Sequence, residues 1–502
     1  MTIGAIIGYT VLALFLGFIA FLIIRTISAR KPKPPESNYV PNDIDDTVVD
    51  NLVEAIKHKT ITMPNNDQDG SVFLEYQAFL EKAYPLIMKN STKYVINKYS
   101  VIYAFKGTES DSLLPIAILA HQDVVPAPAK DWGFDPFGGE ISEGYIYGRG
   151  TQDMKGQMIS ALDGLEFLLR EGKKPARSIY FCFGHDEERA GIYGAYEIVK
   201  FLQQRDVRFE FVLDEGGAII DGKIIGINNK VALVGTCEKG YADVTLEVEK
   251  LGGHASTPTR RTAVGLMSQA VYKLEKRKMK PFFSEPVKEM FETLAPYMNP
   301  LFKFFIVNRR VFGWLLKRVL TIASPFTNCI VRTTIAPTQM FGATTPNTLP
   351  PVAKANVNCR INTGETIDDL TNHIKKVVGK NIKVTVRDGA SNPSLVSSPD
   401  SPAFKMIGKT VYEVFDGFIM APYPFIATSD SKYYHVLSDN VYRFTPFEKE
   451  ESDANRIHGV NERLSVNMLK TATQFFIRLY ENTCFDDFSV PKRKSLVSNH
   501  LY

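Results

Sequence analysis

Histidine and carboxylate residues follow two apolar runs of this chain, at the points where strands would end. His121 and Asp123 come after the run 116–120, and Asp214 follows the run 209–213. In a parallel sheet, side chains at the carboxyl ends of strands point into the crevice where α/β enzymes bind substrates. His121 is therefore a candidate metal ligand, and Asp123 could accept the other N–H of its ring. A structural histidine with ordinary hydrogen bonds is the competing interpretation.

Three consecutive carboxylates, Asp186, Glu187 and Glu188, follow another apolar run that ends near Gly184. Their negative charges repel one another unless cations are bound nearby. Glu187 and Glu188 could divide two roles, one as a metal ligand and the other as a general base. An acidic helix start that is stabilised by the helix dipole is the alternative.

Two more candidate ligands, Asp153 and His458, lie in loops. Asp153 stands where a glycine-rich turn leads into a helical stretch, a position in which aspartate can also serve only as a helix cap. His458 lies far downstream, in the polar segment 456–462. With the strand-end residues they supply two histidines and several carboxylates, the nitrogen and oxygen ligands that suit two zinc or similar ions.

Strand-like and helical patterns alternate around these segments. Short apolar runs typical of buried strands occupy 116–120, 179–183 and 209–213. Alternation of strands with helices predicts an α/β fold with a mainly parallel sheet flanked by helices. We expect a discontinuous catalytic domain, residues 47–244 and 364–485, and an inserted α+β lid or dimerisation domain, residues 245–363.

The first residues of the chain form an uncharged apolar stretch, 3–24, that is long enough to cross a bilayer as a helix. A cleaved signal peptide is the alternative, but its apolar region has roughly 7–15 residues and follows a basic start. We predict a membrane anchor at 1–25, a proline-rich stalk at 26–46 and a C-terminal tail at 486–502.

Two signals disagree about the side of the membrane on which the domain lies. Basic residues after the apolar stretch, Arg25 and Arg30 among them, favour a cytosolic domain by the positive-inside rule. The sequence Asn90-Ser91-Thr92 is an N-glycosylation pattern, which matters only in the secretory lumen. We expect a single-pass membrane protein with a lumenal or extracellular catalytic domain, and the orientation stays open, as does a secreted form.

Composition excludes other classes of function. The net charge of +4 on 502 residues is too small and too evenly spread for nucleic acid to be the main partner. Five cysteines without CxxC spacing indicate neither a disulfide framework nor a thiolate metal site. The partner is therefore expected to be a small molecule, besides the membrane itself.

Six motifs occur in an order that resembles one enzyme family: AHQDVVP, GRGTQD, GHDEE, VLDEGG, GGHAS and RIHGVNE. The chain resembles the dinuclear zinc metallopeptidase family of aminoacylases, carboxypeptidase S and glutamate carboxypeptidases, over about 46–480. Within that family it is most similar to the N-fatty-acyl-amino acid synthase/hydrolase group, through AHQDVVPAP, NCIVRTT and LPPVAKANVNCRINTGET. Carboxypeptidase S is the next most similar.

This resemblance implies a cofactor and a role for each candidate residue. Two Zn²⁺ ions would be bridged by Asp153 and a water molecule. One ion would also be held by His121 and Asp214, and the other by Glu188 and His458. Glu187 would be the general base, which takes a proton from water and gives it to the leaving amine.

The resemblance also assigns residues within the predicted insert. His254 resembles the family histidine that stabilises the oxyanion, often in the site of a neighbouring subunit, which would imply a homodimer. Asn347 and Arg360 resemble residues that bind the free carboxylate of the substrate. A turn histidine and a surface ion pair are the alternatives for His254 and Arg360. The chain departs from the family at Ala427, where relatives commonly have glycine.

The substrate is expected to be an N-fatty-acyl amino acid, which the enzyme would hydrolyse or, in reverse, form. The aromatic segment 290–320 could form a hydrophobic tunnel or a membrane-facing surface for the acyl chain. Alternatively, it could form the core of the insert or its dimer face. Short peptides, cut by an exopeptidase like carboxypeptidase S, are the first alternative. A non-catalytic scaffold is the second, and an intact set of ligands argues against it.

Overall fold

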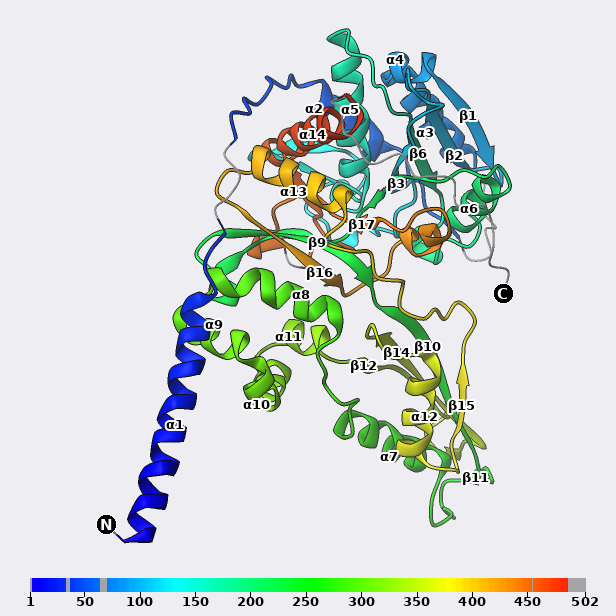
Figure 1. Cartoon of the computed structure of the whole chain (residues 1–502). Helices are drawn as coiled ribbons and strands as arrows, with labels where there is room; N and C mark the ends of the chain where they lie inside the picture. The colour runs from blue at the N-terminus through cyan, green and yellow to red at the C-terminus, as the bar shows by residue number, and fades with distance from the viewer. Residues whose placement is uncertain (1, 33–36, 64–69, 454, 486–502) are drawn as a thin grey trace.

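The computed structural model describes residues 2–32, 37–63, 70–453 and 455–485. Its larger unit is a nine-stranded sheet with the order β1-β2-β6-β3-β7-β17-β9-β16, and β8 pairs with β9 (Figure 1). The strands are β1 (Ser91–Ile96), β2 (Ser100–Phe105), β3 (Ile116–His121), β6 (Ile179–Gly184), β7 (Val212–Asp214), β8 (Ala218–Asp221), β9 (Lys230–Glu238), β16 (Ile419–Phe425) and β17 (Val441–Arg443). The central pairs β6–β3, β3–β7 and β7–β17 are parallel, which confirms the predicted fold class.

Helices cover both faces of this sheet, so its central strands are buried on both sides. Successive residues of β3 show this directly, because Ile116 and Ile118 pack on one face whereas Ala117 and Leu119 pack on the other. The first face is covered by α2 (Thr47–Lys57), α3 (Ser71–Ala83), α4 (Pro85–Lys89), α5 (Lys155–Arg170), α13 (Pro402–Val414) and α14 (Val466–Tyr480). The second is covered by α6 (Ala195–Gln203). Burial on both faces explains why these strands read as continuous apolar runs.

The smaller unit is a four-stranded antiparallel sheet with two helices packed against it. The strands, in spatial order, are β12 (Thr334–Phe341), β14 (Val352–Ile361), β10 (Gly240–Glu249) and β15 (Lys383–Val386). The helices are α7 (Ala263–Lys276) and α12 (Ile367–Val378). A short ladder of β11 (Gly253–His254) and β13 (Thr348–Leu349) lies beside them. This sheet extends beyond the predicted limits of the insert, 245–363, in both directions.

Four helices of the same stretch pack elsewhere. These are α8 (Glu285–Leu294), α9 (Pro300–Val307), α10 (Arg309–Ala323) and α11 (Pro325–Ile330). Their apolar residues, Met290 and Leu316 among them, share one cluster with Leu233 of β9 and Tyr423 of β16. The middle of the predicted insert therefore packs against the large sheet rather than in the core of the small one.

The N-terminal helix α1 (Ile3–Ser28) projects from the body of the molecule (Figure 1). Within the described ranges it is the one helix long and apolar enough to cross a membrane, a test that a signal sequence also passes. Nearly all its side chains are exposed, and only Leu22 is buried. Residues 33–36 of the predicted stalk and the predicted tail, 486–502, lie outside the described residues.

Candidate metal centre

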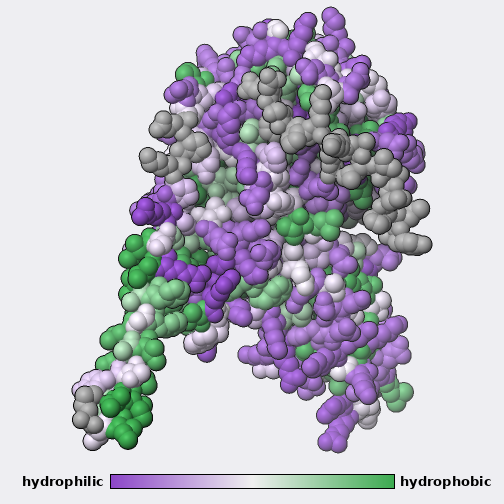
Figure 2. Space-filling view, in the orientation of Figure 1, coloured by the Kyte–Doolittle hydropathy of each residue, from purple (hydrophilic) through white to green (hydrophobic). Residues whose placement is uncertain are grey.

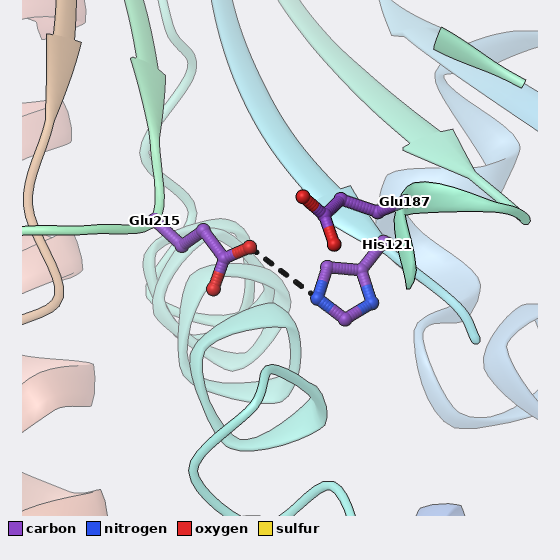
Figure 3. Close-up of side chains that lie close together, drawn as sticks. All are labelled: His121, Glu187 and Glu215. Carbon is purple, nitrogen blue, oxygen red and sulfur yellow. Dashed lines mark ion pairs between the residues drawn. The ribbon is translucent and has the colours of Figure 1, made fainter. Parts of the chain in front are cut away.

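Three side chains converge at the carboxyl ends of the parallel strands. His121 ends β3, Glu187 follows β6 and Glu215 follows β7. Figure 3 shows Glu187 and Glu215 directed toward the His121 ring, and the ring Nε2 lies 3.4 Å from a Glu215 carboxylate oxygen. These three residues each offer a ligand atom, and the three atoms lie within 4.8 Å of one another. Together these three side chains could hold a cation.

Asp153 lies between the two histidines. Its Oδ1 is 3.0 Å from the Nε2 of His121, and its Oδ2 is 3.0 Å from the Nε2 of His458. The same nitrogen of His458 is 3.1 Å from a carboxylate oxygen of Glu188. Since each oxygen of Asp153 faces a different histidine, this carboxylate is placed to touch two ions at once.

Asp123 positions both His121 and the acidic segment. The His121 Nδ1 lies 2.8 Å from the Asp123 backbone oxygen and 3.5 Å from its carboxylate. The two carboxylate oxygens accept hydrogen bonds from the backbone N–H groups of Glu187 and Glu188, both at 3.1 Å. One buried aspartate thus joins the end of β3 to the start of the segment that carries the proposed base.

Glu215 was not among the residues singled out from the sequence, which favoured Asp214. In the structure the Asp214 oxygens accept hydrogen bonds from the backbone N–H groups of Glu215 and Ser431, both at 2.8 Å. The Glu215 carboxylate, in contrast, reaches His121. The adjacent Asp-Glu pair at the end of β7 was the available signal, but neighbouring residues point in different directions and the sequence alone does not say which one faces the site.

The electrostatics of the centre reflect crowding of buried carboxylates. Burial raises the pKa of Glu187 well above its usual value, and burial together with the Asp153 charge raises the pKa of Glu215 to about 8. Burial lowers the pKa of His121, but the nearby carboxylates outweigh it and raise that pKa well above normal. Hydrogen bonds to Asp153 and Glu188 raise the pKa of His458 to about 10. Cations bound among these groups would relieve the repulsion, so the donor set fits a pair of divalent ions.

A second buried carboxylate, Glu462, holds the loops that carry Asp153 and His458. Its Oε1 accepts from the backbone N–H groups of Gly150, Gln152 and Asp153, at 3.1, 2.9 and 3.2 Å. Its Oε2 accepts from the guanidinium of Arg149 at 2.5 Å, and Arg149 also donates to the backbone oxygen of Gly459 at 2.8 Å. The Arg149–Glu462 pair therefore fixes two loops that are distant in sequence.

We expect replacement of Glu462 by alanine to lower the free energy of unfolding by about 3–5 kcal/mol, because it leaves the buried Arg149 charge without its partner. Urea denaturation of the full chain measures this effect. The matched control is Glu450→Ala, since that exposed carboxylate lies 4.0 Å from Arg463 and should contribute about 0–1 kcal/mol. Equal effects of the two substitutions would show that the buried pair has no special structural role.

The structure keeps His254 and Asn347 together but apart from the other candidates. His254 on β11 pairs with Thr348 of β13, and the backbone N–H of Ala255 donates to the oxygen of Asn347 at 2.9 Å. Figure 1 places β11 at the far end of the small unit, away from β3. Within one chain, His254 thus lies outside the metal centre.

Arg360 lies where the two units meet. It is on β14, its guanidinium stacks on the Tyr241 ring at 4.9 Å, and it donates to the Thr428 hydroxyl at 3.4 Å. Thr428 belongs to the loop after β16. Arg360 therefore faces the large unit and is partly exposed, as a carboxylate-binding residue must be.

Comparisons with known proteins agree with this geometry. Residues 117–482 match the model of peptidase family M20/M25/M40. The chain is 37% identical to the N-fatty-acyl-amino acid synthase/hydrolase PM20D1 of Xenopus tropicalis, over 97% of each protein. It is 34% identical to the probable carboxypeptidase S-like 2 of Dictyostelium discoideum, over 94% of this chain and 93% of the relative.

A solved structure shares the fold. It is the M20 family metallo-carboxypeptidase Sso-CP2 of Sulfolobus solfataricus, which superposes with a TM-score of 0.65 at 15% identity and covers 87% of this chain and 99% of its own. The family match spans more than half of this chain, and relatives above 30% identity align with nearly all of it. The protein therefore belongs to peptidase family M20/M25/M40.

Proposed function

We propose that this protein is a dinuclear zinc amidohydrolase that cleaves N-fatty-acyl amino acids into a fatty acid and a free amino acid, and forms them in reverse. The observation that carries the proposal is Asp153 between two histidines, with Glu187 and Glu215 beside the first of them. Near full-length similarity to a synthase/hydrolase of N-fatty-acyl amino acids supports the choice of substrate.

The chain's own residues would hold the two ions. His121, Asp153 and Glu215 would bind one, with Glu215 in the place that the sequence assigned to Asp214. Asp153, Glu188 and His458 would bind the other. Nitrogen and carboxylate oxygen ligands suit zinc and similar divalent ions. Ions held there would lower the pKa of a water molecule toward neutral and would polarise the amide carbonyl.

Glu187 would move the proton. It is buried, its pKa is raised by that burial, and it lies next to the His121 and Glu215 ligands. It takes a proton from the attacking water as the oxygen bonds to the acyl carbon, and gives it to the nitrogen as the carbon–nitrogen bond breaks. The products are a fatty carboxylate and a free amino acid.

Residues of the small unit would bind and polarise the substrate. Arg360, with Asn347, would bind the free carboxylate, and His254 would donate to the carbonyl oxygen. Because β11 and the adjoining Asn347 lie far from β3 within one chain, we propose that His254 and Asn347 act in the site of a second copy, in a homodimer formed through the inserted domain. A strictly monomeric active enzyme in sedimentation analysis contradicts this assembly.

We expect Arg360→Ala to raise KM about 10- to 100-fold for substrates with a free carboxylate, since a hydrogen bond to a charged group is worth about 1.5–3 kcal/mol. Steady-state kinetics with the free acid and with its carboxamide tests the role. The carboxamide should show little change in KM. Arg360→Lys should recover only part of the loss, because lysine keeps the positive charge but lacks the bidentate geometry. An equal rise for both substrates rejects carboxylate binding.

The substrate itself is tested by offering the enzyme N-oleoyl-phenylalanine and a simple dipeptide, each with and without a zinc chelator. Chelator-sensitive release of oleate, with the dipeptide left intact, is the expected result. Cleavage of the dipeptide alone would favour the exopeptidase alternative, which the similarity to a carboxypeptidase S-like protein supports. Turnover that resists chelation contradicts both.

We further propose that α1 anchors the protein in a membrane with its catalytic domain in the lumen or outside the cell. An exposed apolar helix of 26 residues is long enough to span a hydrocarbon core of about 30 Å. Asn90 is exposed, as a glycosylation site must be. We expect the chain to resist carbonate extraction and to lose mass on N-glycosidase treatment, except in Asn90→Gln. Unchanged mass of the unsubstituted chain contradicts glycosylation of Asn90 and removes this support for a lumenal domain.

A further inference from the structure

Helices α9 and α10 form a hairpin whose inner face belongs to the protein core. Ile306 and Leu316 are buried and pack with the large sheet, and Phe305 packs against the same cluster. Phe312 contacts Phe305 across the turn, with ring centroids 5.2 Å apart. These contacts attach the hairpin to the body of the protein. The side chains on the opposite side of α9 and α10 therefore point away from the core.

The outer face of the hairpin is apolar and exposed, as far as the described part of the chain shows. On α10 the exposed residues recur at helical spacing, so they form one stripe. Trp314 is 67% exposed and Ile322 is 75% exposed, which is unusual for side chains of this size. The exposed large apolar residues of the hairpin are Leu301, Phe302, Val311, Trp314, Val319 and Ile322. Beside them, a shallow groove is lined by Leu315, Arg318, Val319, Ile322 and Ala323.

The charged residues of α9 and α10 themselves are all basic, and Arg309, at the start of α10, pairs with the exposed Glu292 of α8. The sequence contains no aspartate or glutamate between Glu292 and Glu365. Arg310 and Arg318 are exposed on α10, and Lys317 is partly exposed between them. Long basic side chains next to an apolar stripe can bury their methylene groups while their charged ends reach phosphate groups. This combination favours a phospholipid surface over a neutral protein partner.

The hairpin is joined to the proposed membrane helix. The Asn308 side chain, at the turn between α9 and α10, donates to the Leu22 backbone oxygen at 3.3 Å and to the Thr26 hydroxyl at 3.0 Å. Both Leu22 and Asn308 are fully buried in this contact. Figure 2 shows the hydrophobic surface of α1 continuing onto the adjoining part of the body at α9. If α1 crosses a bilayer, the hairpin beside its C-terminal end lies at that bilayer's surface.

We propose that the outer face of the α9–α10 hairpin is a second membrane contact, which inserts Trp314 and its apolar neighbours among the lipids while Arg310, Lys317 and Arg318 bind headgroup phosphates. The proposal rests on α1 being a membrane helix, as put forward above. Tryptophan and basic residues around an apolar stripe are the features of helices that lie in the plane of the interface. Two contacts, one spanning and one lying on the surface, would hold the domain at a set height and rotation above the lipids that contain its acyl substrate.

The two tryptophans of the chain, Trp132 and Trp314, make a direct test possible. The full chain carrying Trp132→Phe is reconstituted into phosphatidylcholine vesicles with or without brominated acyl chains, because bromine quenches only tryptophan that lies among the lipid chains. We expect strong quenching of Trp314. The matched control is Trp314→Phe, whose remaining Trp132 should show little quenching. Trp314 fluorescence that is insensitive to bromine, or no more sensitive than Trp132, overturns the proposal, whether solvent or a second copy of the chain covers the face.

A second experiment asks whether the contact serves catalysis. We expect Ile322→Glu to reduce quenching of Trp314 and to slow hydrolysis of an N-oleoyl amino acid held in vesicles several-fold, with a soluble short-chain N-acyl amino acid unaffected. Leu74→Glu is the control, because Leu74 is 50% exposed but lies on α3 of the large unit, away from α10 (Figure 1). Equal slowing on both substrates, or by both substitutions, contradicts the role. If neither substrate is hydrolysed, the proposed function fails, while the quenching measurement still decides whether the face meets the membrane.

Discussion

Replacing Glu187 by glutamine should lower kcat about 100- to 10,000-fold with little change in bound metal, because the amide keeps the size of the side chain but cannot accept the proton of water. The buried position of Glu187, next to two proposed ligands, makes it the best-placed base in the centre. Turnover of N-oleoyl-phenylalanine and the metal content per chain, measured on one preparation, give the two readings needed.

The outcome separates a base from a ligand, since the geometry of the three converging residues also allows Glu187 to touch an ion. Glu188→Gln is the matched control, because Glu188 is the neighbouring carboxylate and contacts His458 at 3.1 Å. We expect that variant to lose metal as well as activity. Loss of metal in Glu187→Gln would instead assign Glu187 as a ligand, and normal turnover would reject any catalytic role.

Replacing Glu215 by alanine should abolish tight binding of one ion and, with it, turnover. The Glu215 carboxylate lies 3.4 Å from the Nε2 of His121. In the described part of the loop that directly follows β7, it is the one side chain that reaches this ring. Removing a ligand of a three-residue protein set leaves too few donors to hold the ion against water. Isothermal titration of zinc into the metal-free protein measures the affinity of each site.

Asp214→Asn is the companion variant to Glu215→Ala. The Asp214 oxygens are used by two backbone N–H groups, so the substitution should disturb the end of β7 without removing a ligand. We expect a loss of about 10- to 100-fold in metal affinity, as for other residues that support ligands. If Asp214→Asn costs more affinity than Glu215→Ala, the ligand is Asp214, as the sequence first indicated, and the roles given to these neighbours must be exchanged.

The sequence by itself determined the fold class and most of the centre. A strand that is buried on both faces of a sheet needs apolar residues at every position. Continuous apolar runs such as 116–120 therefore predict central parallel strands, and this one places His121 at a strand end. The ordered motifs match one family pattern, which assigns His121, Asp153, Glu188 and His458 to a single site. The side chains of these four residues do lie in contact in the structure. Periodicity and residue type are local properties, which one chain displays directly.

Only the tertiary structure decided which side chains face the site and which distant segments of the chain contact each other. Whether Asp214 or Glu215 faces His121 depends on how the chain turns after β7. The structural role of Glu462 is visible only in the structure, where four donors from a loop about 310 residues away in sequence converge on its carboxylate. The helices α8–α11 were placed in the insert by sequence order, yet their apolar residues share one cluster with β9 and β16 of the large sheet, and α9 also contacts α1. Such choices are made by packing between segments far apart in the chain, and no local pattern encodes them.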